Sequence, residues 1–278
     1  MKIIADSSST RTEWALVDGT DIVAEASTEG LNPFFQSRRE ISHCVRLQLP
    51  EAFFKRRWDK VYFYGAGCST EERKDTVKAS LVAQFKTPIE VESDLLGAAR
   101  GMFINSAGLA CILGTGSNSC LYDGYGIVQN VKPLGFILGD EGSGSALGKL
   151  FLSDCLKNLA PRQLQDEFYA QFNVTPDEIM DSVYVMSLSN KTLSKYSFFL
   201  AAHLDNDYVH TLVHDEIMRF FKRNISQYDY VNYPLCFVGA VACTYSDILK
   251  EVASEFGASI KKIVPRSMPG LIEFHGKE

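Results

Sequence analysis

Long runs of one charge, long apolar runs and an apolar leader are all missing from this chain of 278 residues. The net charge is -6, and Lys and Arg are too scattered for the counterion release that drives nucleic-acid binding. The longest weakly polar stretch, residues 234–245, is too short to cross a bilayer. Asp6 interrupts the start before the apolar region of a signal peptide could form. We therefore expect a cytoplasmic protein that binds neither nucleic acid nor a membrane.

The cysteines lack a pattern that would make them metal ligands or disulfide partners. They number seven, which is odd, and no two are spaced as Cys-x-x-Cys. Reduced thiols in a cytosolic enzyme fit this usage better than a disulfide framework or a zinc site. Cys111, Cys120 and Cys236 lie in apolar, strand-like runs, and we expect them in the core.

Two familiar motifs are present only in incomplete form. Residues 144–150 resemble a P-loop, but the segment is one residue short and has Leu150 where a magnesium-binding Ser or Thr belongs. His210 and His214 are spaced i, i+4, yet no Glu follows the first as a metalloprotease helix requires. We expect both histidines to be surface residues.

The positive signal comes from two similar segments, residues 4–12 and 112–119. Each runs an apolar strand into a tight turn of small and hydroxylated residues, where backbone N–H groups can converge on an anion. Each is followed by a second strand that ends in a glycine turn, at residues 14–17 and 120–122. This duplicated strand-turn-strand unit suits a nucleoside triphosphate.

The rest of the chain alternates strands and helices and then becomes mostly helical. Residues 60–64 and 89–92 have the pattern of buried strands. Between them, residues 70–85 form a helical pattern whose apolar face carries Val77, Leu81, Val82 and Phe85. The likeliest junction is Asn105-Ser106-Ala107-Gly108, which predicts domains of residues 1–105 and 106–278. Apolar stripes then predict helices around residues 209–220 and 248–256.

Six segments in order resemble the N-acetylglucosamine kinase branch of the BadF-type ATPase family. This family lies within the sugar kinase, heat-shock and actin superfamily. The resemblance spans nearly the whole chain and implies an α/β fold of two ribonuclease-H-like domains around a central cleft, with a more helical second domain available for a homodimer contact. The segments are the Asp6 turn and residues 30–33, 92–99, 114–118, 138–143 and 238–242.

The resemblance implies an ATP-dependent kinase that phosphorylates an amino sugar, with N-acetylglucosamine 6-phosphate as the expected product. Asp6 would hold Mg²⁺, usually through water in this superfamily. Phosphoryl transfer asks the protein mainly for charge neutralisation and positioning. The phosphate-binding residues would be Ser8, Ser9, Thr10 and Arg11 with Gly114, Thr115, Gly116 and Ser117, and the adenosine would lie on Gly239, Ala240 and Val241.

Asp94 is the candidate base, because kinases of this branch place an Asp at this motif within reach of the attacking sugar hydroxyl. The same residue could instead be an ordinary helix N-cap, with the helix dipole favouring its ionised form. The resemblance also implies a set of sugar-binding residues, two of which have a structural alternative: Asn32 could be a turn asparagine before a proline, and Asp140 a loop acid. The set is Asn32, Gly67, Asn118, Asp140 and Glu141.

The chain departs from the family in places, and two other functions stay open. Ser7-Ser8-Ser9 replaces a glycine-rich loop, which predicts a stiffer turn, and Ala240 replaces the second glycine of the adenosine motif. An activator ATPase would need a shared iron–sulfur cluster, for which Gly67-Cys68-Ser69 is the one Gly-Cys at a helix start. A sugar sensor without activity would need neither Asp6 nor Asp94.

Overall fold

The structure is a computed structural model that describes residues 1–55, 57–184 and 190–277. It divides into two compact units. The first consists of Met1–Ala110, Cys120–Gln129 and Arg266–Glu278, and the second of Cys111–Ser119 and Asn130–Pro265. The C-terminal residues therefore belong to the same unit as the N-terminus, and they contribute a polar side chain to the site described below.

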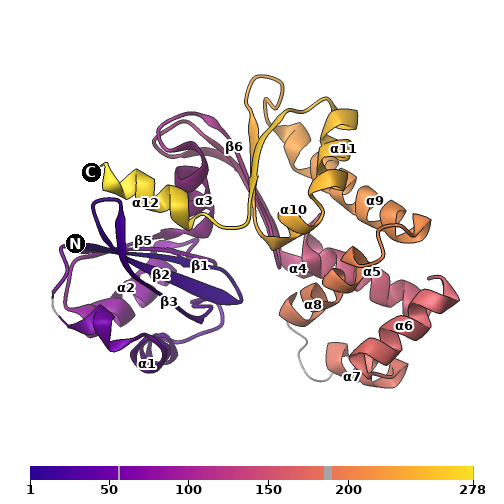
Figure 1. Ribbon diagram of the computed structural model, residues 1–278, viewed down its shortest axis with the longest axis horizontal. Helices are drawn as coiled ribbons and strands as arrows, with labels where there is room; N and C mark the ends of the chain where they lie inside the picture. The colour runs from indigo at the N-terminus through magenta and orange to yellow at the C-terminus, as the bar shows by residue number, and fades with distance from the viewer. Residues whose placement is uncertain (56, 185–189, 278) are drawn as a thin grey trace. The chain divides into compact units, whose positions relative to one another are not determined.

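A five-stranded mixed sheet forms the centre of the first unit, with the strand order β3-β2-β1-β4-β5 (Figure 1). Neighbouring strands β1, β2 and β3 pair antiparallel, whereas β4 pairs parallel with β1 and β5 parallel with β4. Strands β1, β3, β4 and β5 consequently all point the same way. The strands are β1 (Lys2–Ser7), β2 (Arg11–Asp18), β3 (Asp21–Glu29), β4 (Lys60–Gly65) and β5 (Ile89–Ser93).

Strand β1 is buried on both faces because helices cover the sheet on each side. Its alternating side chains separate, with Ile3 and Ala5 in one apolar cluster and Ile4 in another. The first cluster includes residues of α1 and α2, and the second includes residues of α12; α3 and α12 also pack together. The helical segments are α1 (Arg38–Gln48), η1 (Glu51–Phe54), α2 (Glu71–Phe85), α3 (Asp94–Phe103) and α12 (Met268–Gly276).

The second sheet repeats the strand order of the first. Its order is β10-β9-β6-β7-β8. In both sheets the strand that comes first along the chain is central, and the second and fourth strands along the chain lie on either side of it. This repetition confirms the predicted α/β class with two related halves. The strands are β6 (Gly108–Leu113), β7 (Ser117–Tyr122), β8 (Ile127–Val131), β9 (Leu235–Val238) and β10 (Ile260–Val264).

Helices make up most of the rest of the second unit. Buried Val209, Val213 and Ile217 on α9 and Val252 on α11 confirm the two predicted apolar stripes. Aromatic residues fill the space among the preceding helices, where the Phe151 and Phe168 rings lie 5.2 Å apart edge to face. The helical segments are α4 (Gly135–Leu138), α5 (Gly144–Leu156), α6 (Arg162–Phe172), α7 (Pro176–Tyr184), α8 (Asn190–Ala201), α9 (Asp207–Arg223), η2 (Ile225–Gln227), α10 (Ala240–Thr244) and α11 (Ser246–Phe256).

The incomplete P-loop is a helix-packing segment. Residues 144–150 lie in α5, and a Cβ at Gly148 would come within 1.9 Å of the Leu193 carbonyl oxygen. A Cβ at Gly144 would come within 2.3 Å of Ser194 Oγ. The two glycines, one helical turn apart, therefore let α5 and α8 approach closely.

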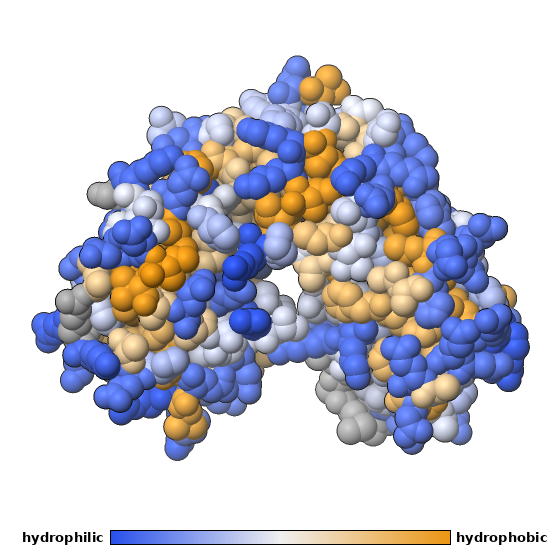
Figure 2. Space-filling view, viewed as in Figure 1, coloured by the Kyte–Doolittle hydropathy of each residue, from blue (hydrophilic) through white to orange (hydrophobic). Residues whose placement is uncertain are grey.

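The surface and the cysteines agree with the composition. Polar residues cover most of the face seen in Figure 2, and apolar residues form separate patches there. Cys111, Cys120 and Cys236 are fully buried, as expected. On α2, Val77, Leu81 and Phe85 are buried but Val82 is exposed, so that part of the predicted face was wrong. Among the described residues, every helix is too short or too polar to span a membrane.

Candidate active site

Four of the predicted site residues follow strands of the first sheet at one edge. Strand register sets Asp6 opposite Tyr64 and Tyr64 opposite Glu92, so β1, β4 and β5 end at the same level. Asp94 comes directly after β5, and Asn32 and Gly67 follow β3 and β4 closely. Ligands of open α/β sheets bind outside this carboxyl edge, where loops are free to present polar groups.

Asp6 carries an unfavourable charge in this environment. Burial, the Asp94 charge and the Glu13 charge raise its pKa from 3.8 to about 7, against the lowering effect of hydrogen bonds from Ser267. Glu13 lies directly opposite Asp6 in the β1–β2 pairing. Glu13 Oε2 is buried and lacks a hydrogen-bond partner among the described residues. The three acids therefore concentrate negative charge, and Arg266 lies 3.6 Å from Glu13 Oε1.

Ser93, and not Asp94, is the N-cap of α3, although the Asp94 side chain still accepts a backbone N–H of the first turn. Ser93 is the N-cap, and its side chain accepts a hydrogen bond from the Leu96 N–H. Asp94 is the first helical residue, and its Oδ1 accepts the Leu95 N–H at 2.9 Å. Burial outweighs these backbone hydrogen bonds and raises the pKa of Asp94 to about 6. The backbone N–H groups at the helix start favour the ionised form of Asp94, as expected, but burial, which the sequence did not indicate, outweighs them.

The first predicted phosphate turn is a closed hairpin turn between β1 and β2. Ser8 N–H donates to the Arg11 carbonyl at 2.9 Å, and Ser8 Oγ accepts the N–H groups of Thr10 and Arg11. Within the described chain, six non-glycine residues have positive φ, and none lies in this turn. Gly30 backs the turn, since a Cβ there would lie 2.5 Å from the Ser8 carbonyl oxygen. The Ser8 side chain thus stabilises the turn without a glycine at positive φ. Ser9 lies between Ser8 and Thr10.

Asn32 and Gly67, predicted to bind sugar, lie against each other. Asn32 Oδ1 accepts the Phe34 N–H at 2.9 Å, which fixes the amide. Gly67 has a φ of +82°, and a Cβ there would lie 2.1 Å from Asn32 Oδ1. Gly67 is therefore required twice, for its backbone conformation and for the space that the asparagine occupies.

The second predicted phosphate turn is braced by the loop before α5. Gly114 N–H donates to the Gly116 carbonyl, and Ser145 N–H donates to the Thr115 carbonyl at 3.1 Å. Asp140 Oδ1 accepts the Ser117 N–H at 3.4 Å. A Cβ at Gly116 would meet Asp140 Oδ2 at 2.8 Å, so the absence of a side chain lets the carboxylate lie on the turn.

Burial raises the pKa of Asp140 to about 6. Its backbone has a φ of +56°, an uncommon left-handed conformation for a residue with a side chain. Burial and a left-handed backbone both cost stability, and the sugar-binding role of Asp140 stays a prediction.

The predicted adenosine segment lies beside the second turn. Gly239 has a φ of +129°, and a Cβ there would lie 2.3 Å from the Leu113 carbonyl oxygen, one residue before Gly114. Ala240 begins α10 and is exposed, whereas the Val241 side chain is buried. Ala240 does not have a positive φ, so alanine needs no strained backbone conformation at this position.

Glu141 and Asn118 have structural partners. Glu141 is buried, with Oε1 2.6 Å from Arg223 Nε and Oε2 accepting from Asn224 Nδ2 at 3.5 Å. Asn118 Oδ1 accepts the Ser119 N–H at 2.9 Å and also Asn130 Nδ2. Both side chains hold the second unit together, whatever else they contact.

Comparison with solved structures finds a close relative of this chain. No protein-family model and no curated protein matches this chain. A solved structure from Porphyromonas gingivalis, of a protein provisionally named N-acetylglucosamine kinase, is 39% identical, with a TM-score of 0.96 over 100% of this chain and 99% of that one. The chain belongs to the N-acetylglucosamine kinase-like family.

Two more distant solved structures share the fold of this family. A provisionally named N-acetylglucosamine kinase from Chromobacterium violaceum is 15% identical, with a TM-score of 0.77 over 98% of each chain. A provisionally named N-acetylmannosamine kinase from Listeria monocytogenes is 13% identical, with a TM-score of 0.51 over 98% of this chain and 96% of that one. These identities show the fold alone.

Kinases of this kind use a divalent cation, and the acids of the first unit fit one. Carboxylate oxygens are typical ligands of hard cations. Glu13 Oε2 is buried and has no hydrogen-bond partner among the described residues. Within the part of the chain that the structure describes, three ligand atoms gather within 4.8 Å of one another only at His214, Glu251 and Glu255. The group around Asp6 is looser, as suits Mg²⁺, which keeps several of its waters.

Sequence reasoning missed two residues of this acidic group. Glu13 could have been found, because a tight hairpin sets it opposite Asp6 and strand alternation puts both on one face. Ser267 gave no signal. It lies at the start of α12, and its hydrogen bonds to Asp6 arise only because that helix packs on α3.

Proposed function

We propose that this kinase transfers the γ-phosphoryl group of ATP to the 6-hydroxyl of N-acetylglucosamine. The observation that carries the proposal is the pair of desolvated carboxylates, Asp6 and Asp94, at the carboxyl edge of the first sheet. A protein gains no stability from such a pair, so it is retained for chemistry. The name of the P. gingivalis relative supports the choice of sugar.

Asp94 would serve as the base. Transfer forms a bond between the sugar oxygen and the γ-phosphorus, breaks the bond from that phosphorus to the β,γ-bridging oxygen, and releases the hydroxyl proton. A carboxylate with a pKa of about 6 is mostly ionised at neutral pH, yet basic enough to take that proton. Its hydrogen bond from Leu95 leaves the second oxygen to face the hydroxyl.

Asp6 would hold Mg²⁺ through water, with Glu13 beside it. The cation, when bound, neutralises charge on the phosphates. Ser267 would keep Asp6 oriented through its hydroxyl and backbone N–H. The exposed guanidinium of Arg11, which begins β2, would offset phosphate charge further.

The second unit would bind the nucleotide. The backbone of residues 114–117 would contact the phosphates, and the close approach of Gly239 to Leu113 would bring the adenosine segment beside them. In the first unit, Asn32 Nδ2 is the amide group left to contact a sugar after Oδ1 accepts from Phe34. Asp140, in the second unit, would accept a sugar hydroxyl.

The activator ATPase finds no support in the environment of Cys68. This side chain is 1% exposed, and burial raises the pKa of its thiol to about 12. Cluster ligands are thiolates, and a cluster shared across a dimer needs exposed ones. A sensor without activity would have no use for two costly carboxylates.

The test is ATP consumption by the purified protein with Mg²⁺ and a panel of hexoses and N-acyl amino sugars. We expect turnover with N-acetylglucosamine to exceed turnover with glucose, because a site that hydrogen-bonds the N-acyl group rejects a sugar without it. Equal turnover with and without any sugar would contradict the proposal. An absorbance spectrum of anaerobically purified protein that shows an iron–sulfur cluster would favour the activator instead.

A further inference from the structure

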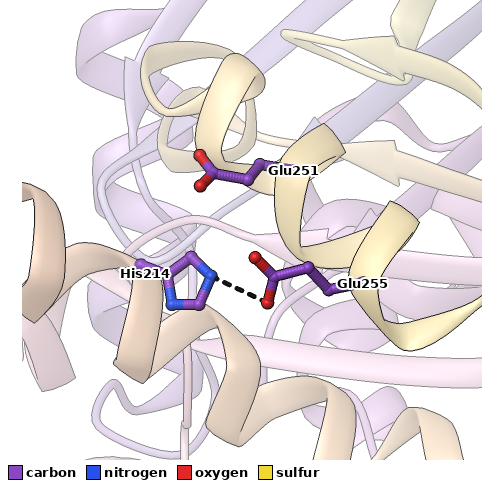
Figure 3. A group of neighbouring side chains, drawn as sticks. All are labelled: His214, Glu251 and Glu255. Carbon is purple, nitrogen blue, oxygen red and sulfur yellow. Dashed lines mark hydrogen bonds and ion pairs between the residues drawn. The ribbon is translucent and has the colours of Figure 1, made fainter.

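Helices α9 and α11 of the second unit present two histidines and two glutamates to each other. Figure 3 shows one of the histidines, His214, with both glutamates. His210 and His214 lie one turn apart on α9, and Glu251 and Glu255 lie one turn apart on α11. His210 Nε2 is 3.3 Å from Glu251 Oε2, and His214 Nε2 is 3.2 Å from Glu255 Oε2. We refer to these four side chains as the α9–α11 cluster.

The donor atoms of this cluster converge as those of a metal site do. One ligand atom each from His214, Glu251 and Glu255 lies within 4.8 Å of the others. Tetrahedral ligands at bonds of roughly 2.0–2.1 Å are separated by about 3.3 Å from one another. The separation between His214 Nε2 and Glu255 Oε2 matches this edge length.

A carboxylate stands behind the imidazole of His214. Asp215 Oδ1 lies 3.5 Å from His214 Nδ1, the long limit of a hydrogen bond. Metal-binding histidines commonly donate the ring N–H that faces away from the metal to a carboxylate, which fixes the tautomer with a free nitrogen toward the ion. With Nδ1–H donated to Asp215, Nε2 would be the free nitrogen, and Nε2 is the atom directed at Glu255 (Figure 3).

We propose that the α9–α11 cluster binds one divalent cation of the zinc class. Imidazole nitrogen with carboxylate oxygen suits Zn²⁺, Co²⁺ or Ni²⁺, whereas Mg²⁺ prefers oxygen alone. His214 and Glu255 supply the firmest ligands, with Glu251 and His210 beside them. None of these four residues belongs to the proposed kinase machinery, so the site is independent of the proposed function.

The alternative to a cation site is a pair of ordinary ion pairs. The side chains of Glu251 and Glu255 are 44% and 49% exposed. Exposed ion pairs of this kind contribute about 0–1 kcal/mol. A cation would instead join α9 to α11 and stabilise the second unit, because it binds only the folded arrangement.

Calorimetric titration of tag-free, metal-stripped protein with Zn²⁺, in excess Mg²⁺ and without nucleotide, tests the proposal. The wild type should bind one Zn²⁺, and Co²⁺ in its place should give the visible absorption of a protein-bound site. His214→Ala should lose binding. Glu255→Gln, at an exposed position that does not endanger folding, should weaken it by about tenfold or more, because loss of an outer partner alone costs roughly 10–100-fold.

Two control variants locate the ion. His203→Ala removes an imidazole in a comparable ion pair, with Nε2 2.9 Å from Glu167. Among the described residues this pair belongs to no group of three metal ligands. Asp6→Asn removes the acid at the proposed magnesium site. Both should bind Zn²⁺ like the wild type. No Zn²⁺ binding by the wild type, unchanged binding in His214→Ala, or loss of binding in Asp6→Asn would each overturn the proposal.

Discussion

Replacement of Asp6 by asparagine should stabilise the magnesium-free protein while it abolishes phosphoryl transfer. The substitution keeps the shape of the side chain and removes a charge that burial, Asp94 and Glu13 all oppose. A carboxylate with a raised pKa binds its proton more tightly in the folded state. Its effect on stability is therefore absent below pH about 4 and grows unfavourable as the pH rises toward 7.

The magnitude follows from the pKa. A rise from 3.8 to about 7 at about 1.4 kcal/mol per pKa unit sets an upper bound of about 4 kcal/mol. The Asp6 side chain keeps some solvent contact, and the asparagine accepts weaker hydrogen bonds from Ser267. We therefore expect a gain of about 1–2 kcal/mol at pH 8, and a smaller one at pH 5.

Urea unfolding of both proteins at pH 5 and pH 8, with and without Mg²⁺, measures this gain. Mg²⁺ should stabilise the wild type and leave Asp6→Asn unchanged. Asp18→Asn, which neutralises an exposed acid at the other end of β2, is the control and should alter neither stability nor the response to Mg²⁺. A variant that is less stable than the wild type by the same amount at both pH values would refute the reasoning.

Three further predictions test other parts of the site. Asp94→Asn should lower kcat by roughly 10²- to 10⁴-fold with little change in sugar affinity. In the wild type, kcat/KM should fall as the pH drops below about 6, where Asp94 becomes protonated. A flat pH profile of the wild type, or near-normal turnover by the variant, would remove Asp94 from the mechanism. Gly67→Ala should raise KM for sugar, because its Cβ would displace the neighbouring amide, whereas Gly19→Ala, also at positive φ but with open space around it, should leave KM unchanged. In Gly114→Ala the added Cβ meets nothing within 4 Å, so the melting temperature should stay the same and only ATP binding should weaken. Gly116→Ala should lower both the melting temperature and the ATP affinity. Unchanged ATP affinity in Gly114→Ala would argue against the phosphate turn.

The fold was predictable where its signals are local. Each hairpin is marked by a polar turn between apolar strands, and the α2 boundaries follow from a Thr70 cap and an apolar face. The face itself was predicted too wide at Val82, because an i, i+1 pair straddles the edge of a helical stripe. The two similar strand-turn-strand segments in the sequence also indicated two related halves, which the repeated strand order shows.

The parts that depend on distant packing were not predictable. Helix α12 joins the first unit because Gly270 and Gly101 let two helices approach; a Cβ at Gly270 would come within 1.7 Å of the Gly101 carbonyl oxygen. That contact brings Ser267 within hydrogen-bonding distance of Asp6. No local pattern around either residue predicts that they meet. The raised pKa of Asp94 was missed for a similar reason, since burial depends on what packs around the helix start.

The most direct test of the central claim is the ratio of products when the protein is incubated with ATP, Mg²⁺ and N-acetylglucosamine. ADP would be quantified by chromatography and the sugar product identified by mass spectrometry and ³¹P NMR. We expect one sugar phosphate, esterified at the 6-hydroxyl, for each ADP formed. ADP without a sugar phosphate would identify an ATPase and contradict the account.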